Sequence, residues 1–285
     1  MMGRPLYPYD RMVTSDELGN EDLEVAVADD DLVVRATIDR EEDRNALNQN
    51  VIGGLLDVFE YADDGEARVV VIRGAGGTFC AGGDIKSMAG AVGQGSQAYR
   101  EGFAGMKNLV EAAVDTAALT VAAVEGYCLA GGMGLAGACD VVLASDEATF
   151  GTPEVDIGIF PAQALVPVMR TVNEKQAFKY LFTGEHFDAE TAHDIGFTTD
   201  VVPADEFEAE LDDLVDGLVT PSGFMIEIGK ESFYNQREMG FDEALDYMRE
   251  MVTMLAMSDD AEEGFNSFLT DSEPDWKGRP DDPDA

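Results

Sequence analysis

The chain has 285 residues, of which 45% are hydrophobic, and its 58 acidic against 18 basic residues give a formal charge of −40. This hydrophobic content excludes a disordered acidic chain, so the charge must coat the surface of a folded protein with one sizeable core or two small ones. Nucleic acid is excluded as a partner, because neutralising phosphates requires clustered lysine and arginine.

Strands that alternate with helical stretches predict an α/β architecture. We expect residues 1–20 to form a loose lead-in and residues 21–203 to form the core. Within this core, the apolar run Ala67–Arg73 predicts a buried strand, and the glycine-rich stretch Gly74–Lys86 follows it. Such a turn, taken alone, is more often a tight connection than a binding site.

A second turn of the same kind follows the buried run Val121–Val124. Here Ala130–Gly134 (AGGMG) opens a segment of small residues, Leu135–Cys139, for which we predict a helix. The first backbone N–H groups of a helix lack partners within it and can hold a developing oxyanion without a charged side chain. Two such turns could each supply one N–H group to the same oxygen atom.

The last part of the core and the residues beyond it carry further signals. In Phe150–Glu154 (FGTPE), Glu154 follows a proline at the end of a predicted strand, where most glutamates simply face solvent. Beyond residue 203 we expect a helical region, 204–270, that begins with a helix over Ala204–Leu218, and an acidic, frayed tail, 271–285. A helical repeat of apolar residues predicts one apolar helix face, formed by Phe241, Ala244, Leu245, Met248, Met251, Val252 and Leu255.

Several classes of site and location can be set aside from the sequence. The three cysteines, Cys80, Cys128 and Cys139, lack CxxC spacing, which predicts free, buried thiols in a reducing cytoplasm. We expect His186 and His193 to face solvent, and therefore no metal site. The sequence has no GxSxG motif, no run of about eighteen apolar residues and no signal-peptide core, so we expect a cytoplasmic protein without a membrane partner. The carboxylate coat predicts a halophilic source, since the Debye length at 1 M salt is only about 3 Å.

Motifs spread over most of the chain, and in a fixed order, resemble those of the crotonase family, also called the enoyl-CoA hydratase/isomerase family. They are Arg44–Asn48 (RNALN), Phe79–Lys86 (similar to FCAGADLK), Val124–Tyr127 with the second glycine turn and Ala138–Asp140, Phe150–Glu154 (similar to FGxPE), Leu181–Glu185 and Val201–Pro203. The resemblance implies a crotonase-like spiral of strand-turn-helix repeats with a C-terminal helical region. It also implies a homotrimer or hexamer, in which the apolar helix face 241–255 packs at a trimer interface; burial in the protein's own core is the alternative.

The resemblance further implies an enzyme that acts on an acyl-CoA thioester through an enolate. Coenzyme A then enters as part of the substrate, and no metal or redox cofactor is needed. The oxyanion hole falls on the backbone N–H groups of Gly83 and Gly131, and Glu154 becomes the acid/base. We expect Val155, Ile157, Ile159 and Phe160 to give Glu154 an apolar pocket that raises its pKa. Residues matched to substrate or CoA binding are Ala46, Ala81, Gly83, Asp84, Ile85, Lys86, Gly131 and Gly132.

Two departures from the family pattern affect the prediction of the reaction. Hydratases of the family carry a first glutamate where this chain has Gly134, and hydration divides naturally between two carboxylates. Migration of a double bond needs only one, so we predict an enoyl-CoA isomerase; the alternatives are a 2-enoyl-CoA hydratase and a catalytically weak CoA-binding or scaffold protein. Gly134→Glu is expected to raise hydration if the pocket has room for it. The second departure is an acidic stretch after Phe268–Leu269 instead of a basic one, which leaves Lys86, Lys277 or Arg279 as candidate phosphate ligands.

Overall fold

The computed structural model describes residues 14–28, 31–84 and 93–276. Its centre is a six-stranded sheet with the order β1-β2-β3-β4-β6-β9. Strand β1 pairs antiparallel with β2, and every other neighbouring pair is parallel. The strands are β1 (Leu23–Ala28), β2 (Val33–Ile38), β3 (Val69–Gly74), β4 (Leu119–Val124), β6 (Val141–Ser145) and β9 (Asp200–Val202).

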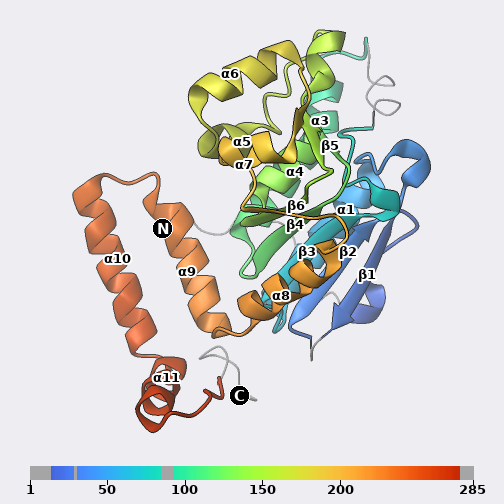
Figure 1. Ribbon diagram of the computed structural model, residues 1–285. Coiled ribbons are helices and arrows are strands. Elements are labelled where there is room, and N and C mark those ends of the chain that lie inside the picture. The colour runs from blue at the N-terminus through green and yellow to red at the C-terminus, as the bar shows by residue number, and fades with distance from the viewer. Residues whose placement is uncertain (1–13, 29–30, 85–92, 277–285) are drawn as a thin grey trace.

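Both faces of this sheet are covered, which explains the continuous apolar runs of β3 and β4. Alternate residues of β3 point to opposite faces, so Val70 and Ile72 belong to the main core while Val69 and Val71 belong to a second one. Helices α1 (Gln49–Asp64), α3 (Ser96–Asp115) and α4 (Gly131–Ala138) contribute to the main core. Helix α8 (Phe207–Val219) lies on the other face (Figure 1) and buries Phe207, Leu211 and Val215 there.

A smaller sheet, β5-β7-β8, joins the elements around the second glycine turn. It consists of β5 (Tyr127–Leu129), β7 (Thr149–Gly151) and β8 (Phe187–Asp188). Around it lie α5 (Val166–Thr171), α6 (Glu174–Thr183) and α7 (Ala189–Asp194). The described residues also include the short 3₁₀ helices η1 (Ser15–Glu17), η2 (Glu41–Asp43), η3 (Ala75–Gly77) and η4 (Pro153–Ile157), of which η4 follows β7.

Three helices, α9 (Gly223–Gln236), α10 (Phe241–Ala256) and α11 (Asp259–Thr270), extend to one side of the sheet (Figure 1). The predicted helix over the apolar face 241–255 is confirmed, but the expectation that the protein's own core buries this face is wrong. No residue of α10 is buried, and Phe241 remains 79% exposed. Helix α10 contacts mainly α9 and α11, so its outer apolar side has no partner within the described chain.

The acidic tail is less frayed than predicted where the structure describes it. The indole Nε1 of Trp276 donates a hydrogen bond to the carbonyl of Thr220, over 2.8 Å, and the Asp275 amide donates to Glu263. These bonds fasten the end of the described chain to the segment between α8 and α9 and to α11. Residues 277–285 lie outside the described residues.

A buried polar network fastens α9 to the core. The ammonium group of Lys230 lies 2.8 Å from Asp140 Oδ2 and also donates to the carbonyls of Ala113 and Ala118. Asp140 accepts further hydrogen bonds from Thr120 and from the Tyr234 hydroxyl. The Lys230 side chain is only 3% exposed, so this ion pair is shielded from water. Asp140 therefore has a structural role just after α4, where it links this helix to α9.

No described helix combines the length and the apolar composition required to cross a membrane.

Replacing Lys230 by Met is expected to lower the free energy of unfolding by about 3–5 kcal/mol, because Asp140 would remain buried without its cation. The control is Lys107→Met, which removes an ion pair with Glu111 whose side chains are 54% and 41% exposed. That change should cost no more than about 0.5 kcal/mol. Denaturant unfolding of both variants measures the two losses in free energy of unfolding. Equal losses would show that the buried Lys230–Asp140 pair stabilises the fold no more than the exposed pair does.

Candidate active site

The two glycine turns lie side by side because the segments that lead into them pair with each other. Phe79 and Cys80 donate backbone hydrogen bonds to the carbonyls of Glu125 and Tyr127, over 2.9 and 3.0 Å, and Leu129 donates back to Cys80. Cys80 and Cys128 thus form a parallel bridge. This pairing brings residues 81–84 next to residues 130–132. The two turns must be neighbours in this way if each is to supply one N–H group to the same oxygen atom.

The two expected oxyanion amides lie close to each other and are free to bind a ligand. A Cβ atom placed on Gly131 would lie 3.3 Å from the backbone nitrogen of Gly83. Within the described residues, neither the Gly83 amide nor the Gly131 amide donates a hydrogen bond to the backbone. Gly131 is also the first residue of α4, where unpaired amides and the helix dipole favour negative charge. The pair can therefore stabilise an oxyanion.

The backbone before Gly131 is held in a conformation that favours glycine. Ala130 has φ 54° and ψ −125°, and its amide donates to the carbonyl of Gly151 over 2.8 Å. Its methyl group explains Gly82, since a Cβ atom at residue 82 would lie 2.5 Å from the Cβ atom of Ala130. Non-glycine residues in such conformations persist where the surroundings enforce them, often at functional sites. The Ala130–Gly151 hydrogen bond also ties the second turn to β7, the strand that leads to Glu154.

Glu154 lies on η4, directly after Pro153, and its side chain is half-buried. Its Oε2 atom is buried and has no hydrogen-bond partner among the described residues. Burial raises the pKa of the Glu154 carboxyl above its ordinary value, against a smaller opposing effect of its own backbone amide. An unpaired carboxylate of this kind is basic and available to a substrate proton.

The expected cause of the raised pKa needs a correction. Of the four apolar residues expected around Glu154, three are largely exposed: Ile157 by 59%, Ile159 by 40% and Phe160 by 38%. The direction of the pKa shift is as predicted, but three of the four side chains expected to enclose Glu154 remain more than a third exposed.

The position of the family's first glutamate is closed in this chain. A Cβ atom on Gly134 would lie 2.4 Å from the carbonyl oxygen of Ala164 and 2.7 Å from its Cβ atom. The backbone of the segment before α5 therefore occupies the space into which a side chain at 134 would grow. The room that Gly134→Glu requires is absent, so this variant cannot add a second carboxylate without moving the backbone.

Most of the other predicted binding residues are brought together. Ala81 donates a backbone hydrogen bond to Arg44 over 3.0 Å, Leu47 donates to Gly82 over 2.8 Å, and Asp84 donates to Leu47 over 3.1 Å. The segment that contains Ala46 thus runs alongside residues 81–84. Gly132 packs so closely on Cys80 that a Cβ atom there would lie 2.3 Å from the Cys80 carbonyl oxygen. Ile85, Lys86, Lys277 and Arg279 lie outside the described residues.

Arg40 belongs to none of the predicted site motifs, yet its guanidinium group contacts both the segment of Ala46 and residue 84. It lies 3.1 Å from the carboxylate of Asp84, and it donates to the carbonyl of Ala46. Its position just after a strand and ahead of the RNALN motif was the available signal, but nothing local in the sequence pairs it with Asp84.

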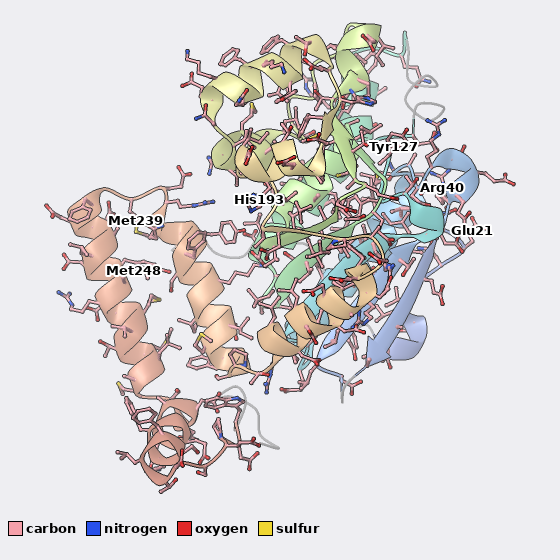
Figure 2. The ribbon with its side chains drawn as sticks, in the orientation of Figure 1. Glu21, Arg40, Tyr127, His193, Met239 and Met248 are labelled. Carbon is pink, nitrogen blue, oxygen red and sulfur yellow. The ribbon has the colours of Figure 1, made fainter. Side chains whose placement is uncertain are left out.

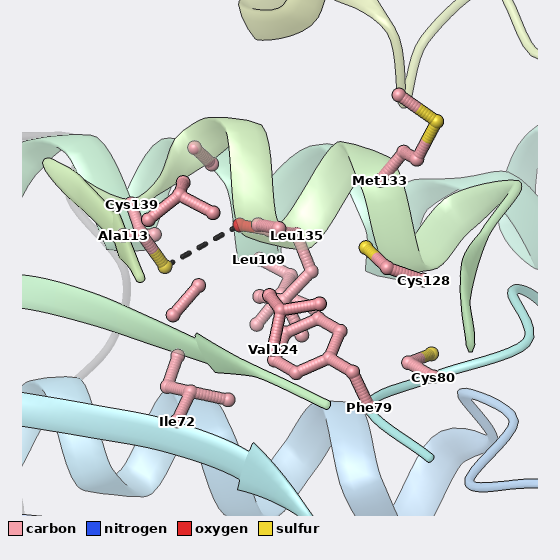
Figure 3. Close-up of a cluster of buried hydrophobic side chains, with 14 of the residues drawn as sticks. Ile72, Phe79, Cys80, Leu109, Ala113, Val124, Cys128, Met133, Leu135 and Cys139 are labelled. Atoms are coloured by element: carbon pink, nitrogen blue, oxygen red, sulfur yellow. Dashed lines mark hydrogen bonds between the residues drawn. The ribbon is translucent and has the colours of Figure 1, made fainter. Parts of the chain in front are cut away.

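The three cysteines are confirmed as free and buried, and Figure 3 shows them among apolar side chains of the core. Burial raises the pKa of the Cys80 and Cys139 thiols to about 12 and raises that of Cys128 as well, so all three remain protonated and unreactive. His186 and His193 are exposed, as predicted. In the described ranges, no three His, Cys, Asp or Glu side chains are grouped so that they could hold a metal ion.

Comparison with known proteins places this site in a family. The model of the enoyl-CoA hydratase/isomerase family matches residues 29–279. A 2,3-dehydroadipyl-CoA hydratase of Escherichia coli (strain K12) is 32% identical over 269 residues, covering 90% of this chain and 99% of the relative. The mitochondrial enoyl-CoA hydratase domain-containing protein 3 of Xenopus laevis is 31% identical over 244 residues, covering 85% of this chain and 82% of the relative.

Solved structures agree with the sequence matches. AtuE of Pseudomonas aeruginosa superimposes with a TM-score of 0.85 at 33% identity, covering 89% of this chain and 98% of that one. An enoyl-CoA hydratase of Mycobacterium smegmatis has the same TM-score at 28% identity, with 90% and 99% covered. These likenesses confirm the predicted crotonase fold and the predicted class of enzyme. The chain belongs to the enoyl-CoA hydratase/isomerase family.

Proposed function

We propose that this protein is an enoyl-CoA isomerase that moves the double bond of a 3-enoyl-CoA to the 2-position with Glu154 as its single acid/base. The carboxylate of Glu154 removes a proton from the carbon next to the thioester carbonyl, and the electron pair moves onto the thioester oxygen. The backbone amides of Gly83 and Gly131 hold the resulting enolate. Glu154 then returns the proton to the carbon at the far end of the conjugated system, so no atom is gained or lost and no metal or redox cofactor takes part.

The observation that carries this proposal is the combination of one unpaired, buried carboxylate with a closed position 134. Glu154 Oε2 has no partner among the described residues, and the backbone of Ala164 fills the place of a second carboxylate. A single base can move one proton between two carbons. Hydration, in contrast, also needs a group that grips and deprotonates water.

Hydration of a 2-enoyl-CoA is the second candidate, and the names of the relatives favour it. The Escherichia coli relative and the Mycobacterium smegmatis structure are both named hydratases. If this chain shares their activity, Glu154 must work with a group other than a side chain at position 134. Measuring both reactions on the same protein decides between the two candidates.

We also propose that the working enzyme is a homotrimer or hexamer in the cytoplasm of a halophilic organism. Large apolar side chains remain exposed on α10 and α11, including Phe241, Phe265, Phe268 and Leu269, each at 67% or more. A second copy of the chain would cover them. The charge of −40 supports a salt-rich cytoplasm, where screening relieves the repulsion between carboxylates.

Glu154→Gln is expected to lower isomerase turnover by about 10²–10⁴-fold while leaving acyl-CoA binding largely intact, because Gln keeps the shape but loses the base. In the wild type, the acidic limb of the pH–rate profile should lie above the ordinary pKa of glutamate, since the ionised base disappears as the pH falls through the raised pKa. The free energy of unfolding of Glu154→Gln should equal or exceed that of the wild type, because the substitution removes a buried charge. Turnover equal to that of the wild type would refute the assignment.

The comparison of 3-enoyl-CoA with 2-enoyl-CoA substrates tests the reaction itself. The unmodified protein, in molar KCl, should isomerise the former faster than it hydrates the latter. Efficient hydration without isomerisation would establish the second candidate, and the absence of both activities from the unmodified protein would leave a CoA-binding or scaffold protein.

Gly134→Ala tests the closure of position 134 by Ala164. The added methyl group should lower the free energy of unfolding by about 1–3 kcal/mol, since it meets backbone that cannot easily move. The control is Gly217→Ala in α8, where a Cβ atom would have nothing within 4 Å. That change should raise stability by up to about 1 kcal/mol, because Ala favours a helix over Gly. Denaturant unfolding measures both, and a neutral Gly134→Ala would show that the site has room.

The thermal midpoint and the activity should both rise between low and molar KCl. The Debye length falls from about 10 Å at 0.1 M to about 3 Å at 1 M, so the self-repulsion of the folded state weakens over this range. Thermal unfolding at a series of KCl concentrations measures the effect. A midpoint that stays flat would contradict the halophilic assignment.

A further inference from the structure

Arg40 lies where β2 ends and η2 begins, and Figure 2 labels its side chain there. The guanidinium group is only 11% exposed and has three carboxylate partners. Its Nε atom lies 3.2 Å from Asp22, and one Nη atom lies 2.8 Å from Asp43 and 3.1 Å from Asp84. The other Nη atom donates to the carbonyl of Ala46. One cation thus holds together three separate segments of the chain.

Two of these segments form the candidate site. Asp84 directly follows Gly83, whose amide is one of the two oxyanion donors of the proposed function. Two backbone hydrogen bonds, from the Leu47 amide to the Gly82 carbonyl and from the Asp84 amide to the Leu47 carbonyl, fix residues 82 and 84 against the segment of Leu47. The Arg40–Asp84 ion pair adds a side-chain tie at residue 84, where the described part of this segment ends. The direction of the Gly83 amide therefore depends on bonds made at both of its neighbours.

The position of Asp84 depends on the positive charge of Arg40, because the other charged groups around it are carboxylates. Without Arg40, three carboxylates would face one another, and Asp84 would remain only 10% exposed at its side chain. Repulsion among these carboxylates, of which Asp22 and Asp84 are only 18% and 10% exposed at their side chains, would push residue 84 outward. A lysine could not replace the contacts in full, since its single ammonium group lacks the planar fork that reaches several acceptors.

We propose that Arg40 is a positioning residue for the oxyanion hole, acting through Asp84 on the Gly83 amide. The inference rests on the proposed function, because it requires that Gly83 hold the enolate. Oxyanion donors act only when they are already aimed at the developing charge, so a small displacement lowers turnover more than binding.

The test uses the variants Arg40→Gln and Asp84→Asn, singly and together, with Arg35→Gln as the matched control. Arg35 lies on the same strand, β2, and forms an exposed pair with Asp212, with side chains 28% and 64% exposed. Both arginine changes remove one positive charge, but only one of them touches the site. Turnover, KM and the thermal midpoint are measured for each variant in molar KCl.

We expect Arg40→Gln and Asp84→Asn each to lower kcat by about 10- to 100-fold at temperatures where they remain folded. Because both act through one ion pair, the double variant should be no worse than Arg40→Gln alone. Arg40→Lys should fall between the wild type and Arg40→Gln, and Arg35→Gln should keep wild-type kcat. This pattern distinguishes an effect on the position of the Gly83 amide from partial unfolding of the protein. Asp84→Asn should cause little unfolding.

A spectroscopic probe reads the oxyanion hole directly. A 3-oxoacyl-CoA binds as its enolate where the hole stabilises the negative charge, and the conjugated enolate absorbs in the near ultraviolet. Both site variants should lose this absorption at saturating ligand, whereas Arg35→Gln should keep it. The probe needs no turnover, so its result stands even if Glu154→Gln shows that the proposed reaction is wrong.

The proposal is overturned if Asp84→Asn keeps wild-type kcat and the full enolate absorption. It is equally overturned if the loss in Arg40→Gln equals its unfolded fraction, or if only KM changes.

Discussion

The candidate site depends on the backbone pairing of residues 79–80 with residues 125–129. This short parallel bridge, centred on Cys80 and Cys128, brings two turns that are about fifty residues apart to one point. Its geometry leaves no room for a side chain at position 132, because a Cβ atom on Gly132 would collide with the Cys80 carbonyl. The small residues around the bridge are thus a consequence of how closely two backbones approach, and the unpaired amides of Gly83 and Gly131 become neighbours as a result.

Each further element of the site is attached to this bridge by a small number of identifiable bonds. The Ala130–Gly151 hydrogen bond connects it to β7 and so to Glu154. The backbone bonds of Leu47 and the ion pair of Arg40 connect it to the segment of Ala46. Glu154 itself makes few contacts at its carboxylate, and the burial that raises its pKa costs stability.

The sequence allowed the strands and the two glycine turns to be predicted because each leaves a local pattern. Continuous apolar runs mark strands that are buried on both faces, and the ordered motifs tie Gly83, Gly131 and Glu154 together through the family resemblance. The contacts that the sequence could not reveal are long-range ones between ordinary residues. Ala164 closes position 134 from thirty residues away, and Arg40 meets Asp84 through a pairing that no local pattern encodes.

The exposure of the apolar residues is the other feature that sequence patterns could not settle. A helical repeat shows that Phe241, Leu245 and Val252 share one face of α10, but it does not show what covers that face. In this chain nothing described covers it, and Ile157, three residues after Glu154, is exposed as well. A protein with a charge of −40 repels its own copies at low ionic strength. Salt therefore acts twice in the proposed enzyme: it relieves repulsion within the fold, and it lets these apolar faces associate, so that assembly and stability should respond to KCl together.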